Sequence, residues 1–489
     1  MKLLTRMISA VISIAILLSA LSACDKSNDD YESKSTAETQ IQSVEQTESI
    51  TETEAVIEKK NYGEDLYLYI EPAANPTKYY WAKESGNDAM SQAIFTRQQI
   101  VYDTLGVDIV GVEAPGPHDY TEAFKTTVMN KDGSIDVMLS HSYLGVDGFV
   151  TGNYLADLNT IPEISIDADY WNSTFMEDLS LNGKMFLGFS DFNIMYTHVI
   201  AFNKELMSKY SSALSESVYE MVDGYRWTLD QMITLANMVY VDTESNGKTI
   251  DDTFGIIGLQ DFPFSGFLHS CDINLVDMDA DGAYTVSVYN EINKNKTNTL
   301  IEKLSTLTKS DCAWFWPYKS ENKVEFYNGK ALMSISETYS LPMYLDYDID
   351  FGILPYPMYD EAQKEVGYRS LQWGGYICVP SYTRNVSMVG DTIEALSYFS
   401  EDVNVTFYEK LLGKQASDSP DDTRMLNVVW DGICCDFAQA YFNAISESYL
   451  LYMVSSLTSE DATQSTSSYV ASIENSVNKK LSKLLKSVK

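Results

Sequence analysis

Short apolar runs of strand character alternate with a helical stretch early in the chain, and this alternation restricts the fold more than any other feature. Residues 66–70 have the pattern of a strand, 89–105 of a helix and 107–112 of a second strand, and 135–139 form a third apolar run. This order and spacing predict parallel α/β construction. Because 489 residues exceed what one hydrophobic core usually organises, we expect two lobes or domains.

Later segments continue the mixture of helices and strands. Residues 228–231 have the pattern of a capping box, and apolar residues follow at helical spacing as far as Tyr240. Residues 350–354 and 376–379 return to strand character. From about Tyr469, the last segment predicts a helix with one apolar face, formed by Val470, Ile473, Val477, Leu481 and Leu484.

The charge balance restricts the partners of the chain. It carries 70 acidic and 34 basic residues, for a formal net charge of −36. Nucleic acids are themselves polyanions, so we expect no nucleic-acid partner. A neutral ligand is unaffected by this argument.

Metal and cofactor sites are not expected. The four histidines are scattered and no HExxH motif occurs. Residues 277–282 imitate the start of an EF-hand loop, but the twelfth position is Val288 where calcium needs a bidentate Glu, so a hairpin turn explains the segment better. Vicinal Cys434 and Cys435 could form a strained disulfide or bind a soft metal, but buried free thiols are the commoner state of such cysteines.

The N-terminus resembles the signal peptide of a bacterial lipoprotein. Lys2 and Arg6 precede an apolar stretch over residues 7–18, and Leu-Ser-Ala-Cys at 21–24 is similar to a lipobox. The resemblance implies that residues 1–23 are removed and that Cys24 is lipidated. An ordinary secretory leader is the alternative. Residues 24–60 add a polar segment with almost no aromatics, which predicts a disordered tether.

Seven short motifs occur in the order found in one known family. They are Asp136-Val137-Met138 with 152–158, Asn182–Gly188, 200–206, Tyr225–Asp230, 326–333, 351–357 and Gly374-Gly375-Tyr376. They are distributed over residues 136–376 of the body that begins near residue 61. On these motifs the chain is similar to the extracellular solute-binding proteins of carbohydrate ABC importers, the maltose-binding-protein family.

The resemblance implies an α/β, two-lobe periplasmic-binding-protein-like fold of type II, with crossover strands joining the lobes and a ligand cleft between them. Lobe 1 is expected at 61–194 and 380–425, and lobe 2 at 195–375 and 430–489. The implied function is capture of a sugar or oligosaccharide by hinge closure and delivery to the transmembrane subunits of an ABC permease. The protein would act as a monomer, lipid-anchored on the outer face of the cytoplasmic membrane.

The resemblance also indicates where a ligand would bind. Tyr339 lies six residues after Met333, where the family places a stacking ring. The other expected ligand-binding residues are Ser140, His141 and Tyr143 after the Asp136 strand; Asp191, Asn193 and Tyr196 at the first crossover; Phe262 and Phe264 in lobe 2; and Trp373 and Trp430 at the later crossovers. Core packing is the alternative for each large aromatic residue.

Two other functions stay open at this stage. An exported glycoside-active enzyme would need only two suitably spaced carboxylates, which 70 acidic residues cannot exclude. A receptor for a peptide, a polyamine or another solute would share the fold. The ordered family motifs, together with the missing G-x-S-x-G and HExxH signatures, favour a sugar receptor over an enzyme.

Overall fold

The computed structural model describes residues 57–70, 80–113, 117–140, 142, 145–193, 197–278, 283–372, 374–413, 420–445 and 450–488. Several predictions fall outside these residues. They concern the signal peptide, Cys24, most of the tether, His141, Tyr143, Tyr196 and Trp373.

The first sheet has four strands in the order β12-β3-β1-β2. β1 (Glu64–Ile70) pairs in parallel with both β2 (Val107–Glu113) and β3 (Val137–Ser140), and β12 (Tyr376–Cys378) joins the edge antiparallel to β3. The predicted parallel α/β construction is therefore confirmed, with a late strand returning to the early sheet.

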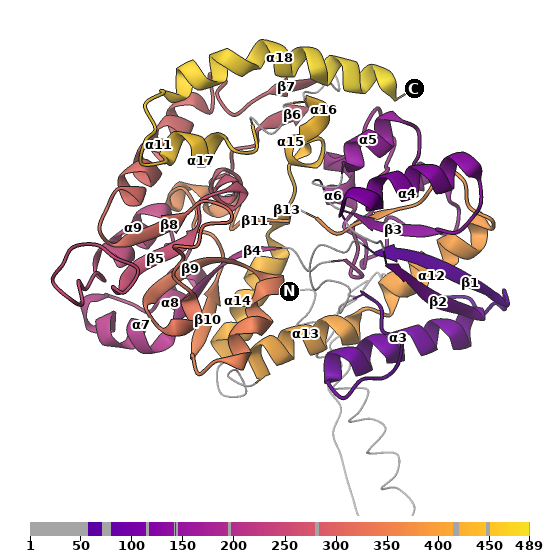
Figure 1. The fold of residues 1–489 in the computed structure, drawn as a ribbon, viewed down its shortest axis with the longest axis horizontal. Helices are drawn as coiled ribbons and strands as arrows, with labels where there is room; N and C mark the ends of the chain where they lie inside the picture. Colours follow the sequence, from indigo (N-terminus) through magenta and orange to yellow (C-terminus); the bar gives the residue numbers. More distant parts are fainter. Residues whose placement is uncertain are drawn as a thin grey trace, which may run out of the picture. The chain divides into compact units, whose positions relative to one another are not determined.

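Helices cover both faces of this sheet (Figure 1). α4 (Pro117–Asn130) lies on one face, and α3 (Ala89–Leu105) and α12 (Val386–Tyr398) lie on the other. α3 begins where Asp88 accepts a hydrogen bond from the Ser91 N–H, 3.0 Å away, and ends at Gly106. Gly106 has a φ of 63°, the left-handed conformation that glycine adopts without strain. The helix therefore has the bounds that the sequence predicts.

The second sheet has five strands in the order β10-β4-β9-β5-β8. β5 lies in the middle of a parallel group with β8 and β9, while β4 is antiparallel to β9 and to β10. The strands are β4 (His198–Asn203), β5 (Phe254–Leu259), β8 (Ala313–Trp316), β9 (Ala331–Glu337) and β10 (Phe351–Leu354). Together with the first sheet, this gives the two sheets of a two-lobe α/β fold.

The remaining helices and short turns lie around the two sheets. The capping residue Thr228 accepts from the Gln231 N–H at the start of α9 (Leu229–Asn237), which ends three residues before the predicted Tyr240. The other helices are α5 (Val146–Thr151), α6 (Ser173–Asp178), α7 (Lys204–Tyr210), α8 (Val218–Asp223), α10 (Gly266–Ser270), α11 (Lys294–Thr308), α13 (Glu401–Gly413) and α14 (Pro420–Asp431). The 3-10 turns are η2 (Leu158–Thr160), η3 (Ser211–Ala213), η4 (Phe262–Ser265), η5 (Phe326–Asn328), η6 (Thr338–Asp346) and η7 (Glu361–Glu365).

The predicted hairpin around residues 277–288 is present. β6 (Val276–Met278) and β7 (Tyr284–Val286) pair antiparallel, and the turn itself at 279–282 lies outside the described residues. No group of three or more metal-ligating side chains occurs in the part of the chain that the structure describes.

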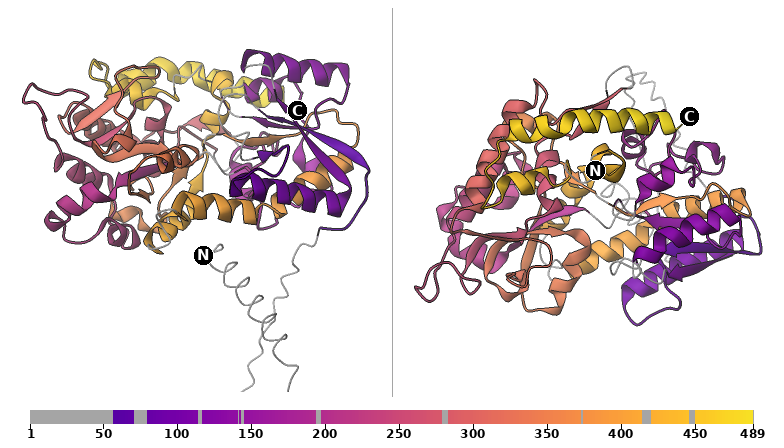
Figure 2. Two further views of the ribbon diagram at one scale, coloured as in Figure 1. Left: turned by 60° about the horizontal axis from the view of Figure 1, so that its bottom comes forward. Right: turned by 45° about the horizontal axis from the view of Figure 1, so that its top comes forward.

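The C-terminal segment consists of α15 (Phe437–Ala440), α16 (Phe442–Ile445), α17 (Met453–Thr458) and α18 (Thr466–Ser487). All five residues of the predicted apolar face of α18 are buried, and the helix runs unbroken beside α16 and β7 (Figure 2). Asn182 donates to the carbonyls of Leu485 and Val488, at 2.8 and 2.6 Å. The chain end is thereby fixed to a loop that follows the first sheet.

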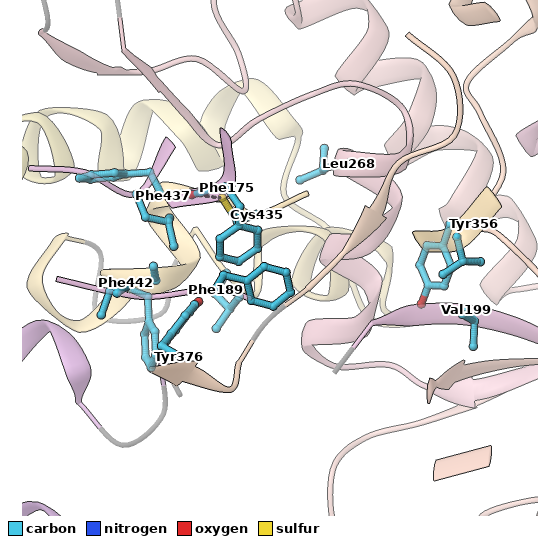
Figure 3. Close-up of a cluster of buried hydrophobic side chains, with 14 of the residues drawn as sticks. Phe175, Phe189, Val199, Leu268, Tyr356, Tyr376, Cys435, Phe437 and Phe442 are labelled. Carbon is cyan, nitrogen blue, oxygen red and sulfur yellow. Dashed lines mark hydrogen bonds between the residues drawn. The ribbon is translucent and has the colours of Figure 1, made fainter. Parts of the chain in front are cut away.

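An aromatic cluster joins the C-terminal segment to residues near the first sheet (Figure 3). The rings of Phe175 and Phe189 stack with centroids 4.2 Å apart, and Tyr376 lies beside them. The Cys435 thiol donates to the Phe175 carbonyl at 3.5 Å. Cys271, Cys312, Cys378 and Cys435 are buried and Cys434 partly buried, and all five are free, as expected.

The predicted lobe boundaries stay predictions. Among the described residues, no helix combines the length and apolar character that crossing a membrane requires.

Candidate functional site

The carboxyl ends of the parallel strands in the second sheet meet at one edge. β5, β8 and β9 all end there, and antiparallel β4 begins there. In open α/β sheets, ligands bind outside the carboxyl ends of strands, because loops and helix ends converge there around exposed backbone groups. Tyr339, Glu337 and His198 stand at this edge.

Tyr339 is held at this edge by Glu337. It is partly buried, two residues beyond the end of β9, and its hydroxyl is hydrogen-bonded to the Glu337 carboxylate. The negative charge of Glu337, followed by burial, raises the pKa of Tyr339. The hydroxyl therefore stays protonated and donates to the carboxylate, which fixes the direction of the ring.

Glu337 has further partners that fix its own position. Its carboxylate accepts from the Ser340 N–H at the start of η6, and Ser340 Oγ donates to the Glu337 carbonyl at 2.7 Å. Glu337 Oε1 lies 3.3 Å from His198 Nε2 on the neighbouring strand, and the His198 ring stacks on Tyr356 with centroids 5.6 Å apart. The chain thus positions one partly buried carboxylate between a tyrosine and a fully buried histidine.

The corresponding edge of the first sheet is described only in part. Ser140, the last residue of β3, is buried opposite Tyr376, and its hydroxyl has no hydrogen-bond partner among the described residues. The residues that directly follow β1, β2 and β3 lie outside the description, and His141 and Tyr143 are among them. A buried hydroxyl without a partner at a strand end is a group that a polar ligand can satisfy.

Hydrogen bonds between two chain crossings connect the sheets. The Thr197 hydroxyl donates to Gln372 Oε1 at 2.9 Å, and Gln372 Nε2 donates to the Gly374 carbonyl at 2.8 Å. Thr338 N–H donates to the Thr197 carbonyl at 2.9 Å, directly beside Glu337. Hydrogen bonds therefore link Gln372 through Thr197 to Thr338, which lies between Glu337 and Tyr339 in the chain.

A further short strand runs parallel to the second crossing. β11 (Ser370–Leu371) pairs with β13 (Ile433–Cys434), and the Gln372 N–H donates to the Cys434 carbonyl at 2.9 Å. Trp430, near the end of α14, is partly buried and packs against the core just before this strand. β13 thus runs beside the second crossing, between α14, which packs against β10, and the C-terminal segment.

Two of the predicted ligand-binding residues, Asn193 and Phe264, are buried and make contacts within the protein. Asn193 is fully buried, and its amide is used by the backbone of Ser190, Gly188 and Gly375, so it shapes the first crossing. Phe264 is fully buried and packs edge-on against Phe267 and Phe315, which is the core packing that was the alternative to a ligand contact; the ligand contact stays a prediction. η4 packs against α10 and α17, and this packing buries the Phe264 ring.

The structure gives fewer side-chain contacts for Asp191 and Phe262, the other predicted residues of this group. Asp191 is partly buried beside Asn193, and its carbonyl accepts from Asn404 Nδ2 at 2.8 Å. The side chain of Phe262 lies outside the description. The structure therefore brings together Tyr339 and the crossings, with Ser140 at the matching edge of the other sheet.

Glu337, His198 and Gln372 were not expected from the sequence, whereas Trp314, Trp316 and Tyr318 stand out in it as an aromatic cluster whose rim-facing ring the sequence leaves open. A usable signal existed for Glu337, because it is the charged last residue of the largely apolar strand β9. His198 and Gln372 gave no signal, since their roles depend on pairing between distant segments.

Comparison with known proteins identifies the family. The family model described as bacterial extracellular solute-binding protein matches residues 95–396. No curated protein matches the chain.

Several solved structures share the fold. The GacH receptor of Streptomyces glaucescens, solved unliganded and with acarbose, has a TM-score of 0.52 and 17% identity, covering 87% of this chain and 99% of its own. Lmo0181 of Listeria monocytogenes, solved with cycloalternan, has a TM-score of 0.54 and 13% identity over 86% and 99%. The Thermus thermophilus maltotriose-binding protein, bound to maltotriose, has a TM-score of 0.51 and 13% identity over 87% and 100%.

These similarities confirm the two-lobe α/β fold of maltose-binding-protein-like receptors, and the match covers more than half of the chain. The chain therefore belongs to the bacterial extracellular solute-binding protein family.

Proposed function

We propose that the protein is the substrate-binding lipoprotein of an ABC importer and that it captures a sugar or oligosaccharide between its lobes. The observation that carries this proposal is Tyr339, a ring fixed by a carboxylate at the strand ends of the second sheet. A sugar offers flat C–H faces to a ring and hydroxyl edges to fixed polar groups, so this pairing suits a carbohydrate.

The similar structures support the same class of ligand. GacH, Lmo0181 and the Thermus protein are described with acarbose, cycloalternan and maltotriose, respectively. Ligand binding in this protein would shift the lobes from open to closed about the crossings, and the closed form would dock on a permease. Cys24 would carry the lipid that holds the protein at the outer face of the cytoplasmic membrane.

A thermal-shift panel tests the proposal. The lipid-free chain, residues 24–489 with Cys24→Ser, is heated with mono- and oligosaccharides, and with amino acids, peptides and polyamines as the counter-panel. A ligand at 100 times its Kd stabilises the folded state by about 2.7 kcal/mol, so a true ligand raises the Tm clearly. Stabilisation by one glycan series supports the proposal, and stabilisation only by the counter-panel contradicts it.

The same incubations test for catalysis. Chromatography of the glycans after heating would reveal cleavage products if the protein were a glycoside-active enzyme. A receptor leaves the glycans intact.

A further inference from the structure

We propose that Tyr318 and Trp316 form a second ring platform beside Tyr339, so that the ligand is an oligosaccharide that spans both positions. This inference rests on the proposed function and specifies the size of its ligand. The platform lies at the carboxyl end of β8, two strands away from the end of β9.

Strand register brings the two positions to the same level. Ile257 of β5 is paired with Trp314 on one side and with Ser334 on the other. Trp316 and Ser336, two residues further along each parallel strand, therefore end at the same height. Tyr318 and Tyr339 follow just beyond that edge, separated by β5, which corresponds to about 9.5 Å across two strand spacings.

Tyr318 is the exposed ring at this edge. Its side chain is 67% exposed, and the Lys319 ammonium lies 5.3 Å from the centroid of its ring. Trp316 is partly buried, and the described residues provide neither a stacked ring nor an acceptor for its indole N–H. Exposed aromatic surface costs hydration free energy, and covering it with a ligand recovers that cost.

The neighbouring rings of the same strand are already used by the fold. Trp314 packs against Phe254 with centroids 5.5 Å apart and donates its indole N–H to the Asn322 carbonyl at 3.1 Å. Phe315 packs edge-on against Phe264 at 5.0 Å. Trp314 and Phe315 thus have aromatic partners within the protein, whereas among the described residues Trp316 and Tyr318 at the strand end do not. Core packing therefore does not account for the presence of these two aromatic residues.

A tight turn holds Tyr318 in place. The Ser320 N–H donates to the Pro317 carbonyl at 3.1 Å, and Lys319 has a φ of 63°. Positive φ at the third residue of a hydrogen-bonded four-residue turn is the type II geometry, which a lysine adopts only at a conformational cost. The turn therefore constrains the backbone at Tyr318 before any ligand arrives, which lowers the backbone ordering entropy lost on binding.

The rings of Tyr318 and Tyr339 follow strands that lie about two strand spacings apart. The Tyr318 hydroxyl makes only a small contribution to the raised pKa of Tyr339, after Glu337, burial and Tyr344. Two rings at this separation on different strands cannot both cover one small sugar ring, so each takes a separate unit of an extended ligand.

Calorimetric titration of a glycan length series tests this inference. The mono-, di-, tri- and hexasaccharides of the series that stabilises the protein are titrated into the lipid-free full mature chain and into its variants Tyr318→Ala, Tyr318→Phe and Trp316→Ala. Tyr102→Ala is the matched control, because Tyr102 is also an exposed tyrosine, 51% exposed, on α3.

The expected result is an affinity that rises with chain length in the unmodified protein. Tyr318→Ala should lower the affinity for the tri- and hexasaccharide about tenfold and leave the monosaccharide affinity unchanged, since one stacking ring is lost. Trp316→Ala should act in the same direction, and Tyr318→Phe and Tyr102→Ala should bind like the parent.

Failure of this inference can be told apart from failure of the proposed function. Glycan binding with no length dependence, or with Tyr318→Ala equal to the parent, overturns the second platform and leaves the sugar receptor intact. Absence of binding to every glycan by the unmodified protein overturns the proposed function, and the platform with it.

Discussion

Glu337 and His198 face each other across the β4–β9 pair, with Glu337 Oε1 3.3 Å from His198 Nε2. The same carboxylate receives the Tyr339 hydroxyl, so a buried strand pair determines the direction of a ring at the sheet edge. This relationship connects packing in the second sheet to the proposed ligand site.

Replacing Glu337 should weaken ligand binding through Tyr339. Glu337→Gln removes the charge that the tyrosine hydroxyl donates to, and we expect an affinity loss of about tenfold, since hydrogen bonds to charged groups contribute about 1.5 kcal/mol or more. The measurement is calorimetric titration in parallel with Tyr339→Phe and the double variant. If Glu337 acts by orienting Tyr339, its effect shrinks in the Tyr339→Phe background; equal effects in both backgrounds would refute that role.

The Thr197–Gln372 bond should stabilise the crossing. Both side chains are buried, at 1% and 0% exposure, so Gln372→Leu leaves the Thr197 hydroxyl without its acceptor. We expect a loss of about 1–3 kcal/mol in the free energy of unfolding, measured by urea titration. Thr197→Val with Gln372→Leu should cost less than the sum of the single changes. Strict additivity would show that the bond contributes nothing.

Asp436 and His269 should give opposing pH dependences. They are fully buried, with His269 Nδ1 3.7 Å from Asp436 Oδ2. Burial raises the pKa of Asp436 to about 7 and lowers the pKa of His269 to about 3. The Asp436 contribution to stability is present below pH 3.8 and is lost as pH rises towards 7. The His269 contribution is present above pH 6.5 and is lost as pH falls towards 3.

Between about pH 4 and pH 6.5 the free energy of unfolding falls with pH through Asp436 and rises with pH through His269, so the two changes cancel in the unmodified protein. In Asp436→Asn only the His269 contribution depends on pH. The free energy of unfolding of this variant relative to the parent should therefore rise with pH across this window. Denaturant unfolding at several pH values measures the difference, and Asp103→Asn on exposed α3 surface is the control. A difference that does not change with pH would contradict the assignment.

The apolar face of α18 should carry much of the stability of the C-terminal segment. Leu481 is 1% exposed, so Leu481→Ala creates a cavity and should cost about 2–5 kcal/mol. Ser482→Ala on the exposed side of the same helix is the control and should leave the Tm nearly unchanged. A small effect at Leu481 would mean that the helix adds little to the folded state.

Cys24 should anchor the protein. Cys24→Ser removes the acceptor thiol of the proposed lipid, so the protein should move from the membrane fraction to the medium or periplasm. Fractionation of cells, with labelled palmitate as a second readout, measures this. Membrane retention of Cys24→Ser would contradict the lipid anchor.

Local patterns predicted most of the regular elements. The β1–α3–β2–β3 order and the buried face of α18 follow from hydrophobic periodicity, which depends only on neighbouring residues. The return of β12 to the first sheet could be expected only from the family resemblance. Spacing alone does not specify which distant strands pair.

The site was harder to predict for the same reason. Tyr339 was expected by resemblance, and the structure places it at a strand edge, whereas Phe264 was expected at the ligand and lies in the core. An aromatic residue near a strand end can point either way, and only packing by Phe267 and Phe315 decides the case. His198 and Gln372 act through residues more than a hundred positions away, so no local pattern marks them.

The most direct test of the sugar receptor is calorimetric titration of the most stabilising glycan into the unmodified chain and into Tyr339→Ala. The account predicts a saturable 1:1 isotherm for the parent and an affinity about tenfold or more lower for Tyr339→Ala, because the ring at the strand edge is lost. Equal affinities in the two proteins, or no heat of binding with any glycan, would contradict the central claim.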